Sequence, residues 1–197
     1  MEHAATGGHL ETSTGLDNRK LLMWLFLSSD CLFFGSFIAA YLLYRDKSVV
    51  GPYPSDLFDI PFTSVSAFIL LMSSVSMVLA LAAIQRGDVR RMRIWLVATA
   101  MLGTLFISGQ AYEFTQFYRE GLNLDTNLFG TTFFVLTGFH GAHVTIGILI
   151  LMSLFMWSLG GRIGKEQSLN IELAGLYWHF VDIVWIVIFT LIYLIQT

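Results

Sequence analysis

Seven ionisable side chains lie in or beside otherwise apolar stretches, and their spacing limits the chemistry they could perform. His140 and His143 are three residues apart, and so are His179 and Asp182. Residues three apart share one face of a helix, so each pair points in one direction. The other members of the set are carboxylates: Asp30, Glu113 and Glu172.

Three interpretations of these polar groups are open from the residues alone. Paired histidines and carboxylates could bind a metal, as in di-iron helical bundles, but the Glu-x-x-His motif of those bundles does not occur in this sequence. The groups could instead relay protons or bind a transported ion, although no internal repeat or broken helix of the kind common in transporters is visible. Alternatively, they tie helices together by hydrogen bonds and so fix which helix faces which.

The elements that must position these groups are membrane-spanning helices. The chain is 55% hydrophobic and 13% charged, with a mean hydropathy of +0.68, and a soluble domain carries about 25% charged residues. A span needs about 20 mostly apolar residues, and five stretches qualify: about 21–44, 61–85, 94–117, 128–158 and 173–195. The sequence therefore predicts an all-α polytopic membrane protein, a five-helix bundle.

The placement of Lys and Arg predicts how this bundle is oriented. We expect a polar cytoplasmic tail over residues 1–20 and one transmembrane domain over 21–197. Positive residues favour the cytoplasmic side, and eight of the 11 would lie on the N-terminal side of the membrane: Arg19, Lys20, Arg86, Arg90, Arg91, Arg93, Arg162 and Lys165. The N-terminus is thus predicted to be cytoplasmic and the C-terminus external. The net charge of −3 and the lack of a basic cluster interleaved with aromatics argue against a nucleic-acid partner.

Polar groups inside these helices need internal partners. A carboxylate at the centre of a span costs about 2.5–3.5 kcal/mol on insertion scales. Asp30, His143 and Asp182 would all lie roughly 15–22 Å from the cytoplasmic ends of their helices, because a helix rises 1.5 Å per residue. We therefore expect these three to form one hydrogen-bonded cluster at mid-membrane depth, with His179 nearer the cytoplasm and Glu113 closer to the external surface.

Three segments resemble a known family. "WLFLSSDCLFFGSFIAAYL" (24–42), "TGFHGAHVTIG" (137–147) and "YWHFVDIVWIVIFTLIYL" (177–194) resemble subunit III of haem-copper terminal oxidases, the cytochrome c and quinol oxidases. The resemblance runs from about residue 20 to the C-terminus, and its His-Gly-x-His-Val and Trp-His-Phe-Val-Asp motifs are specific. The chain looks like the short five-helix bacterial form, which lacks the first two helices of the mitochondrial form.

This resemblance implies a non-catalytic subunit of a proton-pumping oxygen reductase in the bacterial plasma membrane. Such a subunit would stabilise subunit I, bind phospholipid in a cleft between its helices and support proton uptake. No cofactor would be bound by this chain, and haem and copper would be held by partner subunits. The implied partners are subunit I, subunit II, other oxidase subunits and phospholipids, with membership of a larger respiratory supercomplex left open. The electron donor is not encoded here, because donors dock on other subunits.

The resemblance also implies roles for the polar residues. Asp30 stands where the long form usually has a glutamate that reacts with carbodiimides, and the Ser-Asp-Cys variant resembles short bacterial subunits, quinol oxidases included. Asp30 and Glu113 would be intramembrane carboxylates of the lipid cleft and its packing. The other five would form a structural polar motif: His140, His143, Glu172, His179 and Asp182. The alternative functions, an independent membrane metalloenzyme and a small ion transporter, would use the same His/Asp cluster.

Overall fold

Five long helices make up the computed structural model, which describes residues 17–47 and 59–195. They are α1 (Asn18–Tyr44), α3 (Ile60–Gln85), α4 (Val89–Arg119), α5 (Leu128–Leu159) and α6 (Ser168–Phe189). Short turns flank them: η1 (Arg45–Lys47), η2 (Lys165–Gln167) and η3 (Thr190–Leu194), the last with π geometry. All five are long and apolar enough to cross a membrane, and no strand occurs among the described residues, which confirms the all-α prediction. Most of the expected 1–20 tail lies outside the described residues.

Aspartate and asparagine side chains set where the helices begin. Asp59 accepts a hydrogen bond from the backbone N–H of Phe62, and Asp88 accepts one from Arg91. Asn127 caps α5 in the same way, through Gly130. Each cap satisfies a backbone donor that the first helical turn leaves free. Because the cap at residue 88 precedes a run of arginines, α4 starts five residues before the predicted position. α6 has no side-chain cap and also starts early, at residue 168 rather than 173.

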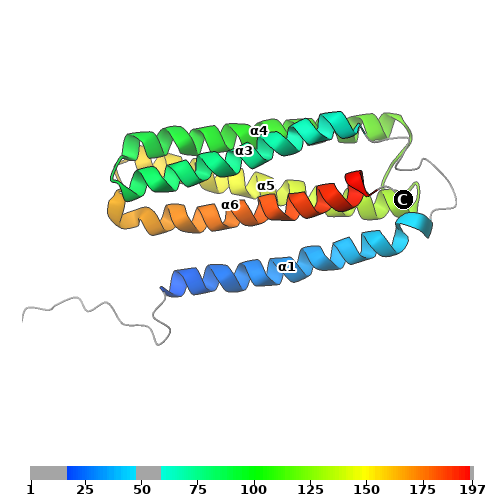
Figure 1. Cartoon of the computed structure of the whole chain (residues 1–197), viewed down its shortest axis with the longest axis horizontal. Helices are drawn as coiled ribbons and strands as arrows, with labels where there is room; N and C mark the ends of the chain where they lie inside the picture. The colour runs from blue at the N-terminus through cyan, green and yellow to red at the C-terminus, as the bar shows by residue number, and fades with distance from the viewer. Residues whose placement is uncertain (1–16, 48–58, 196–197) are drawn as a thin grey trace, which may run out of the picture.

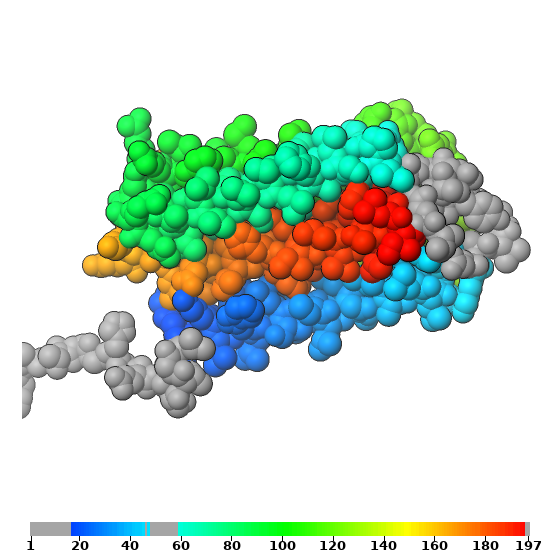
Figure 2. All heavy atoms as spheres, in the orientation of Figure 1, coloured from blue at the N-terminus to red at the C-terminus, as the bar shows by residue number. Residues whose placement is uncertain are grey.

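Four of the helices close into a ring, and the fifth lies outside it. α3 packs on α4, α4 on α5, α5 on α6, and α6 back on α3, whereas α1 packs on α5 and α6 (Figure 1). In the most apolar 18-residue stretch of α1 only 11% of residues are buried, against 56% in the stretch that contains α6. The space-filling view shows α1 as a separate rod laid along α6 (Figure 2). α1 is therefore a peripheral helix on a four-helix core.

Trp178 is the central wedge of that core. Its side chain is fully buried on α6, and its indole Nε1 donates a hydrogen bond of 2.8 Å to Ser73 Oγ on α3. The same ring lies against two glycines. A Cβ atom added at Gly103 of α4 would come within 2.5 Å of it, and one added at Gly147 of α5 within 2.8 Å. One indole thus contacts the three other helices of the ring, and the glycines provide the room it occupies.

Candidate functional site

Asp30 and His143 form a polar pair inside the seam between α1 and α5. Asp30 Oδ2 lies 3.6 Å from His143 Nε2, and both side chains are more than four-fifths buried. His143 Nδ1 lies 2.7 Å from the carbonyl oxygen of Phe139, so it carries the proton of that hydrogen bond. Nε2 then faces the carboxyl group, and the contact is attractive only when the pair holds an additional proton on the imidazole or on the carboxyl group. The pair is therefore a buried polar contact that joins α1 to α5.

Polar contacts also hold α1 at both of its ends. Lys20 Nζ lies 2.6 Å from Glu172 Oε1 at the start of α6. At the other end, Arg45 donates a hydrogen bond of 3.1 Å to the carbonyl oxygen of Ile195. Glu172, one of the predicted motif residues, is thus the partner of a lysine and lies outside the mid-membrane layer. Together with Asp30 and His143, these contacts hold a helix that buries little apolar surface.

An apolar groove lies between α1, α5 and α6. Its volume is about 370 Å³, and it extends from Trp157 and Asn170 at one end of the helices to His143. Apolar side chains of all three helices line it, and the Tyr177 hydroxyl group beside it donates a hydrogen bond of 3.0 Å to the carbonyl oxygen of His143. The walls of the groove are almost wholly apolar, and the polar residue His143 lies at its inner end. The groove therefore suits a hydrocarbon chain rather than a polar metabolite.

Asp182 and His179 belong to a different seam, between α6 and α3. Ser74 of α3 lies 2.9 Å from His179 Nδ1 and donates a hydrogen bond to Asp182 Oδ2. Asp182 has no hydrogen bond to Asp30 or His143, and its other carboxylate oxygen is buried without a partner among the described residues. The prediction of one cluster of Asp30, His143 and Asp182 is therefore wrong: equal depth did not imply a shared side of the bundle.

A serine run in α3, Ser73–Ser74–Ser76, supplies the partners that the sequence analysis missed. Ser73 accepts from Trp178, Ser74 bonds the His179 and Asp182 pair, and Ser76 lies 2.8 Å from the Thr99 hydroxyl group of α4. Serine carries no charge and can bond the backbone of its own helix, so its presence in an apolar helix does not by itself indicate a partner on another helix. Three small polar residues within one helical turn, "SSVS", were the signal that could have identified this seam.

Glu113 is packed between α4 and α3, away from the α1 groove. Its side chain is 6% exposed and accepts a hydrogen bond from Thr63 of α3. One turn earlier on α4, Gln110 donates a hydrogen bond of 3.1 Å to the carbonyl oxygen of Thr137 on α5. Of the two carboxylates assigned by resemblance to a lipid cleft and its packing, Glu113 therefore lies in the packing, whereas Asp30 lies beside the groove.

His140 and His143 lie in different surroundings. His140 is fully buried, and its ring stacks on Trp185 at 5.0 Å with the edges of Phe34 and Phe106 close by. Neither ring nitrogen has a hydrogen-bond partner within the described ranges. Over the same residues, no group of three or more His, Cys, Asp or Glu side chains is arranged to hold a metal ion. The arrangement joins helices through hydrogen bonds and aromatic contacts.

The family model and the individual relatives that match this chain all point to one protein family. The family model described as cytochrome c oxidase subunit III matches residues 1–197. The chain is 35% identical over 177 residues to cytochrome c oxidase subunit 3 of Bacillus sp. (strain PS3), covering 90% of this chain and 86% of the relative. It is 34% identical over 199 residues to quinol oxidase subunit 3 of Bacillus subtilis (strain 168), covering 98% and 97%. It is 38% identical over 180 residues to cytochrome c oxidase subunit 3 of Thermostichus vulcanus, covering 91% and 88%.

Proposed function

Because this chain belongs to the cytochrome c oxidase subunit III family, a subunit of haem-copper oxidases and a multi-pass plasma membrane protein, we propose that it is the accessory subunit that keeps the catalytic subunit I active during turnover. The observation that carries this proposal is the match of the family model to the whole chain. The redox chemistry belongs to haem and copper in the partner subunits. This chain contributes a membrane surface, a lipid-binding groove and a buried proton-holding pair.

The first element of the proposal is lipid binding in the groove between α1, α5 and α6. A groove of about 370 Å³ lies within the size range of small-ligand pockets, and its apolar walls suit an acyl chain. α1 buries only a few of its residues against α5 and α6. Lipid in the groove would fill the space that its side chains leave. We expect the lipid to stabilise α1 against the core.

The second element is support of proton uptake. The Asp30–His143 pair sits at the inner end of the groove and attracts only when it holds an additional proton. We propose that this pair holds a proton beside the groove and so supports proton uptake by the oxidase. With the N-terminus cytoplasmic, as proposed from the sequence, Lys20 and Glu172 would lie on the cytoplasmic side.

Deleting the chain tests the accessory role. We expect an oxidase without it to reduce oxygen at a similar initial rate per subunit I but to lose activity sooner under sustained turnover. Re-expression of the chain should restore the lifetime. Complete loss of initial activity with intact subunit I haems would contradict the proposal. The chain purified alone should carry no stoichiometric transition metal by elemental analysis, and one bound ion per chain would favour a metalloenzyme instead.

Groove-filling variants test lipid binding. Ile150 lines the groove, whereas its neighbour Leu149 is 62% exposed and points elsewhere. Ile150→Trp should displace lipid that co-purifies with the oxidase and shorten its lifetime, and Leu149→Trp should do neither. Equal lipid content and equal lifetime in the two variants would remove the groove from the proposal while leaving the subunit's accessory role intact.

A further inference from the structure

His179 carries a polar atom for which the fold supplies no partner. Its Nδ1 lies 2.9 Å from Ser74 Oγ of α3. Its Nε2 makes no hydrogen bond within residues 17–47 and 59–195, yet it does not belong to the fully buried side-chain atoms that lack a partner. Since the His179 side chain is only partly buried, Nε2 reaches the outer surface of α6.

The hydrogen bonds of Ser74 decide which ring nitrogen of His179 carries the proton. Ser74 has a single hydroxyl hydrogen, and it donates that hydrogen to Asp182 Oδ2. The bond between Ser74 and His179 is therefore donated by Nδ1–H. A neutral imidazole carries one N–H and one lone pair, and a charged ring would cost more free energy in hydrocarbon. Nε2 is thus a hydrogen-bond acceptor that opens outward.

This acceptor lies near the middle of the membrane. His179 is about three turns beyond the start of α6 at Ser168, roughly 16 Å along a helix that crosses a hydrocarbon layer about 30 Å thick. At that depth neither water nor a phospholipid headgroup can donate to Nε2, and a polar group without a partner costs free energy. A side chain on a neighbouring transmembrane helix can donate, so the unpaired atom points to protein rather than to lipid.

Exposed hydroxyl groups elsewhere in the spans create no such need. Ser28, Thr104 and Thr145 each donate to a carbonyl oxygen of the preceding turn of their own helix. His179 Nε2 cannot be satisfied in that way, because it needs a donor and the N–H groups inside a helix are already bonded to its carbonyl groups.

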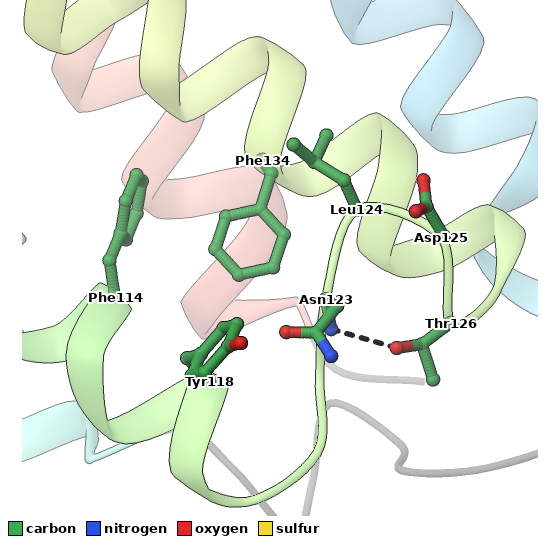
Figure 3. Close-up of a pocket in the computed structure, with 7 residues that line it drawn as sticks. All are labelled: Phe114, Tyr118, Asn123, Leu124, Asp125, Thr126 and Phe134. Atoms are coloured by element: carbon green, nitrogen blue, oxygen red, sulfur yellow. Dashed lines mark hydrogen bonds between the residues drawn. The ribbon is translucent and has the colours of Figure 1, made fainter.

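The surface around His179 is apolar. Leu71 and Val78 share a face of α3 with Ser74 and are 39% and 52% exposed, and Ile183, one turn beyond His179 on α6, is 60% exposed. α6 lies open between α3 and α1 on this side of the molecule (Figure 2). His179 lines neither the α1 groove nor the pocket of about 630 Å³ at the α4–α5 connection (Figure 3). An apolar face outside these hollows, with one polar atom, suits the side of a helix rather than a small molecule.

We propose that this α3–α6 face docks a transmembrane helix of another oxidase subunit, and that a hydroxyl, indole or amide group of that helix donates a hydrogen bond to His179 Nε2. The chain belongs to a family of oxidase subunits, so other membrane subunits are available to supply the helix. Serine, threonine, asparagine and glutamine make such bonds between helices in membranes. The docking depends on neither lipid in the α1 groove nor a proton at the Asp30–His143 pair.

Photo-crosslinking in the assembled oxidase tests the docking face. p-Benzoylphenylalanine replaces either Ile183 or, as a control of similar exposure, Met101 of α4, which is 67% exposed. Adducts are formed in native membranes and mapped by mass spectrometry. We expect position 183 to give several-fold more protein adduct than position 101, on a transmembrane peptide of another subunit that carries Ser, Thr, Tyr, Trp, Asn or Gln. Lipid adducts alone, adducts only to a second copy of this chain, or equal protein adduct at the two positions would overturn the proposal.

Two variants of His179 test the hydrogen bond itself. The asparagine amide lies near the position of Nδ1 and the glutamine amide near that of Nε2, so His179→Asn keeps a donor for Ser74, whereas His179→Gln keeps an outward acceptor. One interhelical hydrogen bond in a membrane corresponds to about threefold in an equilibrium constant. We expect His179→Asn to raise the dissociation constant of the chain from the detergent-solubilised oxidase about threefold, and His179→Gln to leave it near that of the unaltered chain.

The stability of the full chain alone provides the control. Unfolding in SDS should follow the opposite order, because only the asparagine variant keeps the bond to Ser74. Equal dissociation constants for the two variants, or weaker association of His179→Gln than of His179→Asn, would overturn the proposal. Lifetime of the oxidase under turnover reports the accessory role separately, so failure of this docking face and failure of that role can be distinguished.

Discussion

Replacing Gly147 by alanine should destabilise the bundle, whereas the same change at Gly138 on the same helix should not. Nothing lies within 4 Å of a Cβ atom added at Gly138, but one at Gly147 would meet two carbon atoms of Trp178 at 2.8 Å and a Tyr177 carbon at 3.3 Å. Both changes gain about 0.5–1 kcal/mol from the better helix propensity of alanine. Only the second forces a buried indole to move, at a cost of about 1–3 kcal/mol.

The difference between the two variants is therefore expected to be about 1–3 kcal/mol in the free energy of unfolding, because the propensity gain cancels. Steric trapping in micelles or SDS titration followed by tryptophan fluorescence would measure it. The Trp178→Phe background provides the control: it removes the atoms that the new methyl group meets, so the Gly147→Ala penalty should shrink. Equal stability of Gly147→Ala and Gly138→Ala would refute the idea that Trp178 is a fixed wedge between the helices.

Three further predictions concern the polar seams and the start of α1. Thr63→Val removes the hydroxyl donor to buried Glu113 and should lower the free energy of unfolding by about 1–3 kcal/mol. Thr115→Val removes only a hydrogen bond to its own helix, so it should cost far less in the same unfolding assay. A double-mutant cycle of Ser74→Ala and Asp182→Asn should give a coupling free energy of about 0.6 kcal/mol and at most about 1.7 kcal/mol. The cycle of His143→Ala with Asp182→Asn should give no coupling. The reverse pattern would mean that the two seams are misassigned. The Arg19 side chain and backbone N–H, which both donate to Asp17, hold the pKa of this exposed carboxyl group below its ordinary value of 3.8, so its capping contribution is present above that value and is lost as the pH falls through the lowered pKa. The protection factor of the amides in the first turn of α1, which is corrected for the intrinsic pH dependence of exchange, should fall over that acidic range, and Asp17→Asn should abolish this fall.

The helices were readable from the sequence, but most of their pairings were not. Hydropathy identifies each span because a membrane requires a fixed apolar length, and depth follows from counting residues along a helix. Hydropathy does not identify which helices pack against each other. It therefore does not tell which neighbouring helix a given side chain faces. His143 and Asp182 lie at matching depths, yet α6 turns Asp182 toward Ser74 of α3 while His143 faces Asp30 of α1. The missing information was the identity of each helix's neighbours.

For the candidate site, the need for partners could be predicted from the sequence, but the identity of the partners could not. Asp30, Glu113 and Asp182 were expected to need internal partners, and each lies in a seam between helices. Their hydroxyl partners, Thr63 and Ser74, could not be singled out, because a serine or threonine in an apolar helix can bond its own backbone as easily as a neighbour. Ser28 and Ser153 do only that, through Trp24 and Leu149. Distinguishing the two kinds of hydroxyl group requires the packed structure.

The peripheral position of α1 bears on how the chain is made. α1 is synthesised before its main neighbours, α5 and α6, and α3 and α4 are made in between. Until α5 arrives, Asp30 crosses the bilayer without His143, and it carries the cost of about 2.5–3.5 kcal/mol that insertion scales assign to a lone aspartate at the centre of a span. α3 likewise waits for α6 before Ser73 and Ser74 find their partners. The nascent chain thus passes through a stage in which α1 has no helix packed on Asp30 and the ring of α3, α4, α5 and α6 is incomplete. Insertion machinery or a partner subunit that shields α1 would act at that stage of biogenesis.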